Sequence, residues 1–202
     1  MIATRRAMLT GVALVAGLAG RASGGEWEWT PAIEAGGVMA RFHVSPAESQ
    51  ANPFDDRLGF YAGASVSVSN GTAGLRLGAS FVRKGTEIPD DPETITWDAF
   101  EVPVAFELRP TRGSIRPLLL AGVALGRRLD VRSSQFPDAD LDVDDVFTAT
   151  DVGAFVGAGL DAGRFDVEAR YTWGLRNLIA ESSAGSLKSR VFTFGVRFRL
   201  VQ

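Results

Sequence analysis

Apolar and polar residues alternate along most of this chain, and residues 165–176, FDVEARYTWGLR, show the pattern most clearly. Six apolar or aromatic residues, from Phe165 to Leu175, occupy every second position. Charged residues, threonine and glycine occupy the positions between them. A period of two residues is typical of a β-strand that has one apolar and one polar face.

Eight such stretches are predicted to be strands, and they cover residues 28–43, 57–69, 72–84, 94–109, 115–131, 145–161, 165–177 and 188–201. The connections between them alternate in length. The short ones are Asn70-Gly71, 110–114 and 162–164, and the long ones are 44–56, 85–93, 132–144 and 178–187. This alternation is typical of an up-and-down barrel whose two rims face different compartments. The expected fold class is therefore all-β, an eight-stranded antiparallel up-and-down transmembrane β-barrel.

Glycine indicates which face of the predicted barrel points inward. The polar face carries Gly59, Gly63, Gly78, Gly122, Gly126, Gly153, Gly157, Gly159, Gly174 and Gly195. Each glycine in a strand costs about 0.5–1 kcal/mol relative to alanine, so their collection on one face needs a cause. The interior of an eight-stranded barrel is only just wide enough for side chains to fill. The polar face is therefore expected to line the lumen, and the apolar face to meet lipid.

The predicted inner face carries charges of both signs. Its expected members are Glu34, Arg76, Glu101, Glu107, Arg116, Asp151, Asp166, Glu168, Arg170, Arg176, Arg197 and Arg199. The predicted lumen charge network consists of Glu101, Glu107, Arg116, Asp166, Glu168, Arg170, Arg197 and Arg199. Buried ions are tolerated when they are paired and hydrogen-bonded. The sequence therefore predicts a lumen that is plugged by ion pairs.

Some residues depart from the alternation. The exceptions are Leu118, Leu120 and Phe155 on the inner face, and Arg41 and Arg127 on the outer face, where a rim position is expected. Gly36-Gly37 makes the phase of the first strand ambiguous and suggests a β-bulge there. Five aromatic residues are candidates for girdles at the two membrane interfaces, namely Trp27, Trp29, Trp97, Tyr171 and Trp173.

The amino terminus, residues 1–22, has the organisation of a secretory signal peptide, which leaves residues 23–202 as the barrel domain. Arg5 and Arg6 precede an apolar run over residues 7–19, and small residues lead to Ala22. The arginine pair also fits a twin-arginine signal. Removal of this segment with its three arginines changes the net charge from −3 to −6. An acidic mature chain argues against a nucleic-acid partner, and the absence of cysteine excludes disulfides.

Four motifs resemble those of the porin-like outer-membrane β-barrel family, which includes the PorT-type proteins. They are FEVPVAFELRP (100–110), RPLLLAGVALG (116–126), RYTWGLRNL (170–178) and TFGVRFRL (193–200). The last resembles the carboxy-terminal signal by which barrel-assembly machinery recognises such proteins, although this chain ends in LVQ. The resemblance implies an eight-stranded barrel in the bacterial outer membrane, with outer-membrane lipids and lipopolysaccharide as partners. It implies no catalytic residue and no cofactor.

Candidate chemistry is sparse. The one histidine, His43, lies close to Ser45, but no acidic residue is identified that would orient it in a triad. Asp138, Asp140, Asp142 and Asp144 are spaced as in a calcium loop, yet the glycine and the final glutamate of that loop are missing. A solvated acidic loop explains these residues better, with loose binding of a divalent ion as the alternative.

The leading prediction is a non-enzymatic integral outer-membrane protein with a structural role or a role in contacts made by its loops. The alternatives are a lipid-modifying enzyme with His43 as base, a narrow porin-like channel, and a soluble lipocalin-like binder. The last alternative would require an apolar lumen.

Overall fold

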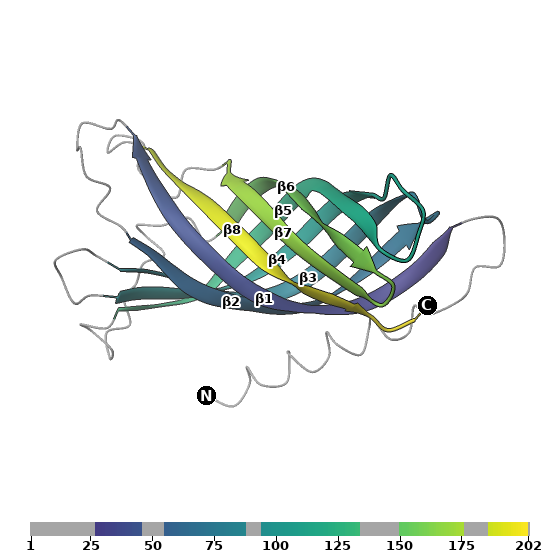
Figure 1. The fold of residues 1–202 in the computed structure, drawn as a ribbon. Helices are drawn as coiled ribbons and strands as arrows, with labels where there is room; N and C mark the ends of the chain where they lie inside the picture. Colours follow the sequence, from purple (N-terminus) through teal and green to yellow (C-terminus); the bar gives the residue numbers. More distant parts are fainter. Residues whose placement is uncertain (1–26, 46–54, 88–93, 134–149, 176–185, 202) are drawn as a thin grey trace, which may run out of the picture.

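The computed structural model describes residues 27–45, 55–87, 94–133, 150–175 and 186–201, which form a closed barrel of eight antiparallel strands in chain order (Figure 1). The strands are β1 (Glu28–Ser45), β2 (Asp55–Ser69), β3 (Ala73–Glu87), β4 (Thr94–Leu108), β5 (Arg116–Ser133), β6 (Thr150–Ala162), β7 (Phe165–Gly174) and β8 (Ser186–Arg199). Figure 1 shows β8, in yellow, lying beside β1, in purple, where the barrel closes. The predicted fold class is confirmed. Within the described ranges, no helix is long and apolar enough to cross a membrane.

The described turns all lie at one end of the barrel. They follow β2, β4 and β6, at Asn70-Gly71, at residues 109–115 and at residues 163–164. Asn70 Oδ1 accepts a hydrogen bond of 2.8 Å from the Ala73 amide, and Gly71 has a φ of 84°, which favours glycine. The connections of residues 46–54, 88–93, 134–149 and 176–185 leave from the opposite end.

The strands are staggered, so that a row of paired residues climbs the wall. The row that starts at Pro31 passes through Val66, Leu77, Val104, Val123, Ala154, Trp173 and Arg190, and returns to β1 at Arg41. Arg41 lies ten residues beyond Pro31, toward the end with the long connections. Such a stagger requires the strands to tilt relative to the barrel axis, as Figure 1 shows.

The outer wall is apolar on every strand. Its exposed side chains include Trp29, Ile33, Leu58, Phe60, Leu75, Leu77, Phe100, Phe106, Leu119, Val123, Leu125, Val156, Leu160, Phe165, Val167, Trp173, Phe192, Phe194 and Val196. Exposed apolar surface of this extent does not occur on monomeric proteins in water. It fits a cylinder whose outer face meets lipid tails.

Glycine allows side chains to cross the seam between β1 and β8. Gly36 and Gly195 face each other across this seam, and the ring of Tyr61 from β2 covers them. A Cβ atom on Gly195 would lie 2.3 Å from the Tyr61 hydroxyl oxygen, which is too close for any real contact. The bulge expected at Gly36-Gly37 is absent, because the pairing of β1 continues unbroken through both residues.

The irregularities of register lie on other strands, between Arg57 and Phe60 on β2 and between Asp98 and Ala99 on β4. In the lumen, Leu118, Leu120 and Phe155 pack with Ala105 into a small apolar cluster. Their departure from the alternation is therefore real.

A second internal cluster consists of Val38, Ala40, Tyr61, Val82 and Val191. Trp97 packs against it, so this tryptophan does not belong to the outer girdle for which it was a candidate. Trp27, Trp29 and Trp173 are exposed, and Tyr171 forms an edge-to-face pair with Trp173 at a centroid distance of 4.9 Å.

Candidate functional site

The middle of the lumen is occupied by Arg76, which β3 directs inward. Its Nε atom donates to Glu107 of β4, and its Nη1 atom donates to Glu168 of β7 at 2.8 and 3.1 Å. The side chains of Arg76 and Glu107 are 2% and 0% exposed. A guanidinium with two carboxylate partners is the arrangement that lets a charge remain buried, because isolated burial costs several kcal/mol per ion.

Arg170 extends this group toward β1. It donates to Glu168, its neighbour two residues away on β7, and its Nη2 atom lies 3.3 Å from Glu34 Oε2. Arg76 and Arg170 therefore share Glu168, and the Arg76 Nη1 atom is also 4.0 Å from Glu34. Side chains therefore connect four strands at this level, namely β1, β3, β4 and β7.

Below this level, Asp166 of β7 receives arginines from β8. Arg197 Nη1 donates to Asp166 at 2.9 Å, while its Nε and Nη2 atoms donate to the hydroxyls of Ser65 and Ser67 at 3.1 and 2.8 Å. Arg199 Nη2 donates to the other oxygen of Asp166. These bonds connect β8 to β2 and β7 across the lumen.

Asp161 gathers arginines at the end of the barrel with the short turns. Arg109, Arg116 and Arg199 each place a guanidinium nitrogen 2.6–2.7 Å from Asp161 Oδ2. Arg109 also lies 3.0 Å from Glu107, which joins this group to the middle of the lumen. Below it the barrel opens into a vestibule of about 720 Å³ that Arg116 and Arg199 help to line.

These ion pairs form one connected set, which we call the lumen network. Its members are Glu34, Arg76, Glu107, Arg109, Arg116, Asp161, Asp166, Glu168, Arg170, Arg197 and Arg199. It contains six arginines and five carboxylates, and most of its side chains are buried. The network fills the section of the lumen between Arg170 and the vestibule.

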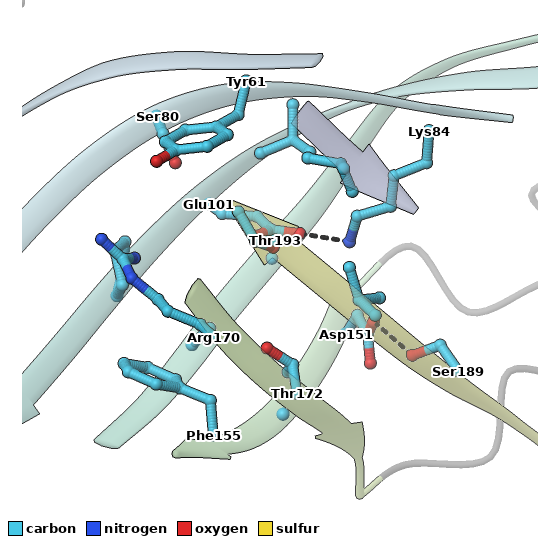
Figure 2. Close-up of a pocket in the computed structure, with 17 residues that line it drawn as sticks. Tyr61, Ser80, Lys84, Glu101, Asp151, Phe155, Arg170, Thr172, Ser189 and Thr193 are labelled. Atoms are coloured by element: carbon cyan, nitrogen blue, oxygen red, sulfur yellow. Dashed lines mark hydrogen bonds and ion pairs between the residues drawn. The ribbon is translucent and has the colours of Figure 1, made fainter. Parts of the chain in front are cut away.

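The half of the lumen toward the long connections contains a small cavity (Figure 2). Lys84 and Glu101 form an ion pair of 2.5 Å there. Ser189 donates to Asp151 Oδ2 at 3.4 Å, whereas Asp151 Oδ1 is buried without a hydrogen-bond partner. Together with Arg170 and other side chains these residues line a cavity of about 50 Å³, which is room for a few water molecules at most.

The structure brings seven of the eight residues of the predicted lumen charge network into the lumen network and places Glu101 above it, paired with Lys84. Three partners, Lys84, Arg109 and Asp161, were not among the charges expected in the lumen. Their positions on β3, at the end of β4 and at the end of β6 follow the same two-residue period, so that period was the signal that could have identified them.

The weaker candidates find less support. Asp138, Asp140, Asp142 and Asp144 lie outside the described residues, as does Arg176. His43 belongs to β1, where its backbone pairs with Lys188, but its side chain is not among those described. In the described part of the chain, no group of three or more histidine, aspartate or glutamate side chains is placed to hold a metal ion.

Comparison with known families decides the identity of the barrel. The model of the outer membrane protein beta-barrel domain matches residues 22–180. The chain belongs to this family of outer-membrane β-barrels. The resemblance noted in the sequence is thereby confirmed, and the bacterial outer membrane is where the protein resides. No curated protein matches the chain.

Solved structures of other outer-membrane proteins are similar to this chain at low sequence identity. Neisserial surface protein A is 16% identical with a TM-score of 0.50, and the match covers 84% of this chain and 97% of that protein. OprG of Pseudomonas aeruginosa is 12% identical with a TM-score of 0.49, covering 86% and 96%. Ail, the attachment invasion locus protein of Yersinia pestis, is 15% identical with a TM-score of 0.46, covering 85% and 98%.

Proposed function

We propose that this family member is a non-enzymatic, non-conducting structural barrel of the outer membrane, whose long connections make its contacts outside the cell. The observation that carries the proposal is the lumen network. A section of lumen filled by buried, mutually paired side chains leaves no aqueous path for solutes. An eight-stranded barrel has little interior space beyond what its own side chains fill.

Ion pairing also gives the inward carboxylates a structural role in place of a catalytic one. Each carboxylate of the network lies within 4.0 Å of at least one arginine nitrogen, as Glu107 does with Arg76 and Arg109. A general acid or base needs access to a substrate and a free proton position. Glu107 and Asp166 have neither, because both are fully buried among arginines and serines.

The partners in this proposal are of two kinds. The lipids of the outer membrane, lipopolysaccharide included, surround the apolar wall. The barrel-assembly machinery recognises the carboxy-terminal strand, residues 193–200, during insertion. No cofactor is required for either.

Planar-bilayer recording tests the proposal. Purified mature protein should insert without stable single-channel steps, under conditions in which a general porin conducts. Steady currents from the wild type would contradict a sealed lumen. As a matched variant, E168A/R170A removes the two members of the network that lie nearest the cavity. The groups around Glu107, Asp166 and Asp161 still fill the lumen below, so this variant should also insert without stable single-channel steps.

The enzymatic alternative has its own assay. Wild-type protein and H43A should give identical product profiles by mass spectrometry after incubation with phospholipid and with lipid A. Release of fatty acid by the wild type that disappears in H43A would identify a lipid-modifying enzyme and contradict the structural role.

A further inference from the structure

Arginine interrupts the apolar outer wall near the rim with the long connections, although on β5 the wall resumes above the arginine with Leu129, which is 53% exposed. On the outward-facing positions of β1, β3, β5 and β8, the first basic residues above the apolar band are Arg41, Arg83, Arg127 and Arg190. We call these four residues the arginine belt. Below the belt, the outward positions of the same strands are apolar or glycine down to the rim with the short turns.

The stagger of the strands places the belt at one level. The row of paired residues climbs ten residues over eight strands, which is slightly more than one residue per strand. Followed in the opposite direction, the row descends by the same amount at each strand. From Arg190 the row descends through Trp173 and Ala154 to Val123, and Arg127 lies four residues above Val123. The descent of the row over these three strands is about four residues, which equals the distance from Val123 up to Arg127. Arg127 is therefore level with Arg190.

The same reasoning locates the other two arginines. The row continues from Val123 through Val104 to Leu77, and Arg83 lies six residues above Leu77, which again matches the descent. Arg41 is the direct partner of Arg190 across the seam. Four arginines on four strands far apart in the sequence therefore share one height on the barrel.

The arginines of the belt differ in whether they pair with other side chains of the protein. Arg83 is paired with Asp98 through two hydrogen bonds of 2.6 and 2.7 Å, and its guanidinium lies over Phe60 and Phe81. Arg127 and Arg190 are exposed, and neither has an ion-pair or hydrogen-bond partner among the residues that the structure describes. The side chains of Arg127 and Arg190 are therefore available to an external anion.

Membrane energetics fix what surrounds these two side chains. An arginine on the lipid-facing wall costs about 2–4 kcal/mol at mid-bilayer and about 0–1 kcal/mol near the interface. Two unpaired arginines directly above an uninterrupted apolar band therefore mark the headgroup level of the leaflet on the side of the long connections. In barrels of this type the long connections face outward, so this is the outer leaflet.

We propose that Arg127 and Arg190 bind the phosphate groups of lipid A in the outer leaflet. This inference rests on the proposed function, because it requires an integral barrel with its long connections outside. The guanidinium group suits phosphate, since its planar fork of donors matches the geometry of phosphate oxygens. The two sites lie on separate parts of the wall and engage separate lipid molecules.

The test compares three forms of the full mature chain in phosphatidylcholine nanodiscs, using native mass spectrometry to measure binding of added lipid A. They are the wild type, R127Q/R190Q, and R112Q/R164Q as a control that removes two exposed arginines from the short turns. Each basic residue near a charged headgroup contributes about a fivefold effect on affinity, so each of the two sites in R127Q/R190Q should bind lipid A about fivefold more weakly. The control should bind as the wild type does.

A second pair of arms identifies the phosphate as the group that is bound. Lipid A stripped of both phosphates should bind the wild type and R127Q/R190Q equally. R127K/R190K keeps the charges and should retain most of the affinity for intact lipid A, and it also serves if the glutamine variant folds poorly. Equal binding of intact lipid A by the wild type and R127Q/R190Q would overturn the inference.

Failure of this inference is distinguishable from failure of the proposed function. If the wild type migrates as a heat-modifiable barrel in phosphatidylcholine but shows no preference for phosphorylated lipid A, only the belt inference fails. If the wild type does not form a heat-modifiable barrel in any bilayer, the integral-membrane role itself is contradicted.

Discussion

Replacement of Arg76 by methionine tests whether the lumen network holds the barrel together. The substitution removes the ion pairs to Glu107 and Glu168, together with the weaker interactions with Glu34 at 4.0 Å and Asp166 at 3.8 Å. Methionine has a similar length and leaves no large cavity. The expected effect is therefore electrostatic.

The magnitude follows from what remains in the lumen. Breaking a buried ion pair by removing one partner costs about 3–5 kcal/mol, because the other charge stays buried. Here Glu107 keeps Arg109 at 3.0 Å, and Glu168 keeps Arg170. Neither carboxylate is left alone, so we expect a loss of about 3 kcal/mol, at the lower end of that range.

The assay is urea unfolding in lipid vesicles, followed by tryptophan fluorescence and by the heat-modifiable band. R76M/E107Q removes one charge of each sign and should recover at least half of the lost stability. R116M is the matched control, because Arg116 is 24% exposed and pairs with an aspartate that keeps two other arginines, so the loss should be about 0–1 kcal/mol. A loss of under about 1 kcal/mol for R76M would refute the reasoning.

Three further predictions address the seam, the wall and the amino terminus. G195A places a Cβ atom 2.3 Å from the Tyr61 hydroxyl oxygen and 2.5 Å from the Ala35 carbonyl oxygen. It should lower the free energy of unfolding by about 1–3 kcal/mol in the same assay. An unchanged midpoint would show that the seam relaxes freely. V156R puts a charge on a side chain that is 49% exposed on the outer wall, and about 2–4 kcal/mol should be lost in vesicles. If V156R were neutral, that part of β6 would not face lipid tails. Amino-terminal sequencing of protein from membranes should begin after Ala22, and detection of residues 1–22 in the mature protein would contradict cleavage.

The strand count, the order and the facing of side chains were predictable from the sequence, because a slip of one residue exchanges the two faces of a strand. Phe165, Val167 and Trp173 lie outside, and Asp166 and Glu168 lie inside, as their alternation indicated. The phase of β1 was harder to predict, since Gly36-Gly37 carries no side chain that reveals a face. The structure shows that these glycines make room for Tyr61 and Phe194 instead of a bulge.

The pairing within the lumen could not be predicted from local patterns. Which arginine meets which carboxylate depends on the stagger, which brings Arg76 of β3 to Glu168 of β7 across 92 residues of chain. Trp97 was misassigned although its face was predictable, because it shares the inward phase of Glu101 and Glu107 on β4. Alternation predicts the face on which a residue lies, whereas its partner follows only from the closed ring.

The alternation of apolar and polar residues in the wall also affects how the unfolded chain would cross the inner membrane. Because polar, charged or glycine residues interrupt the apolar ones at short intervals, the described strands contain no apolar segment long enough for an inner-membrane translocation channel to release sideways as an anchor. If residues 1–22 direct export as predicted, these strands would therefore not hold the unfolded chain in the inner membrane. Its affinity for a bilayer is created by closure itself, when the ring of strands sorts the two kinds of side chain to opposite sides.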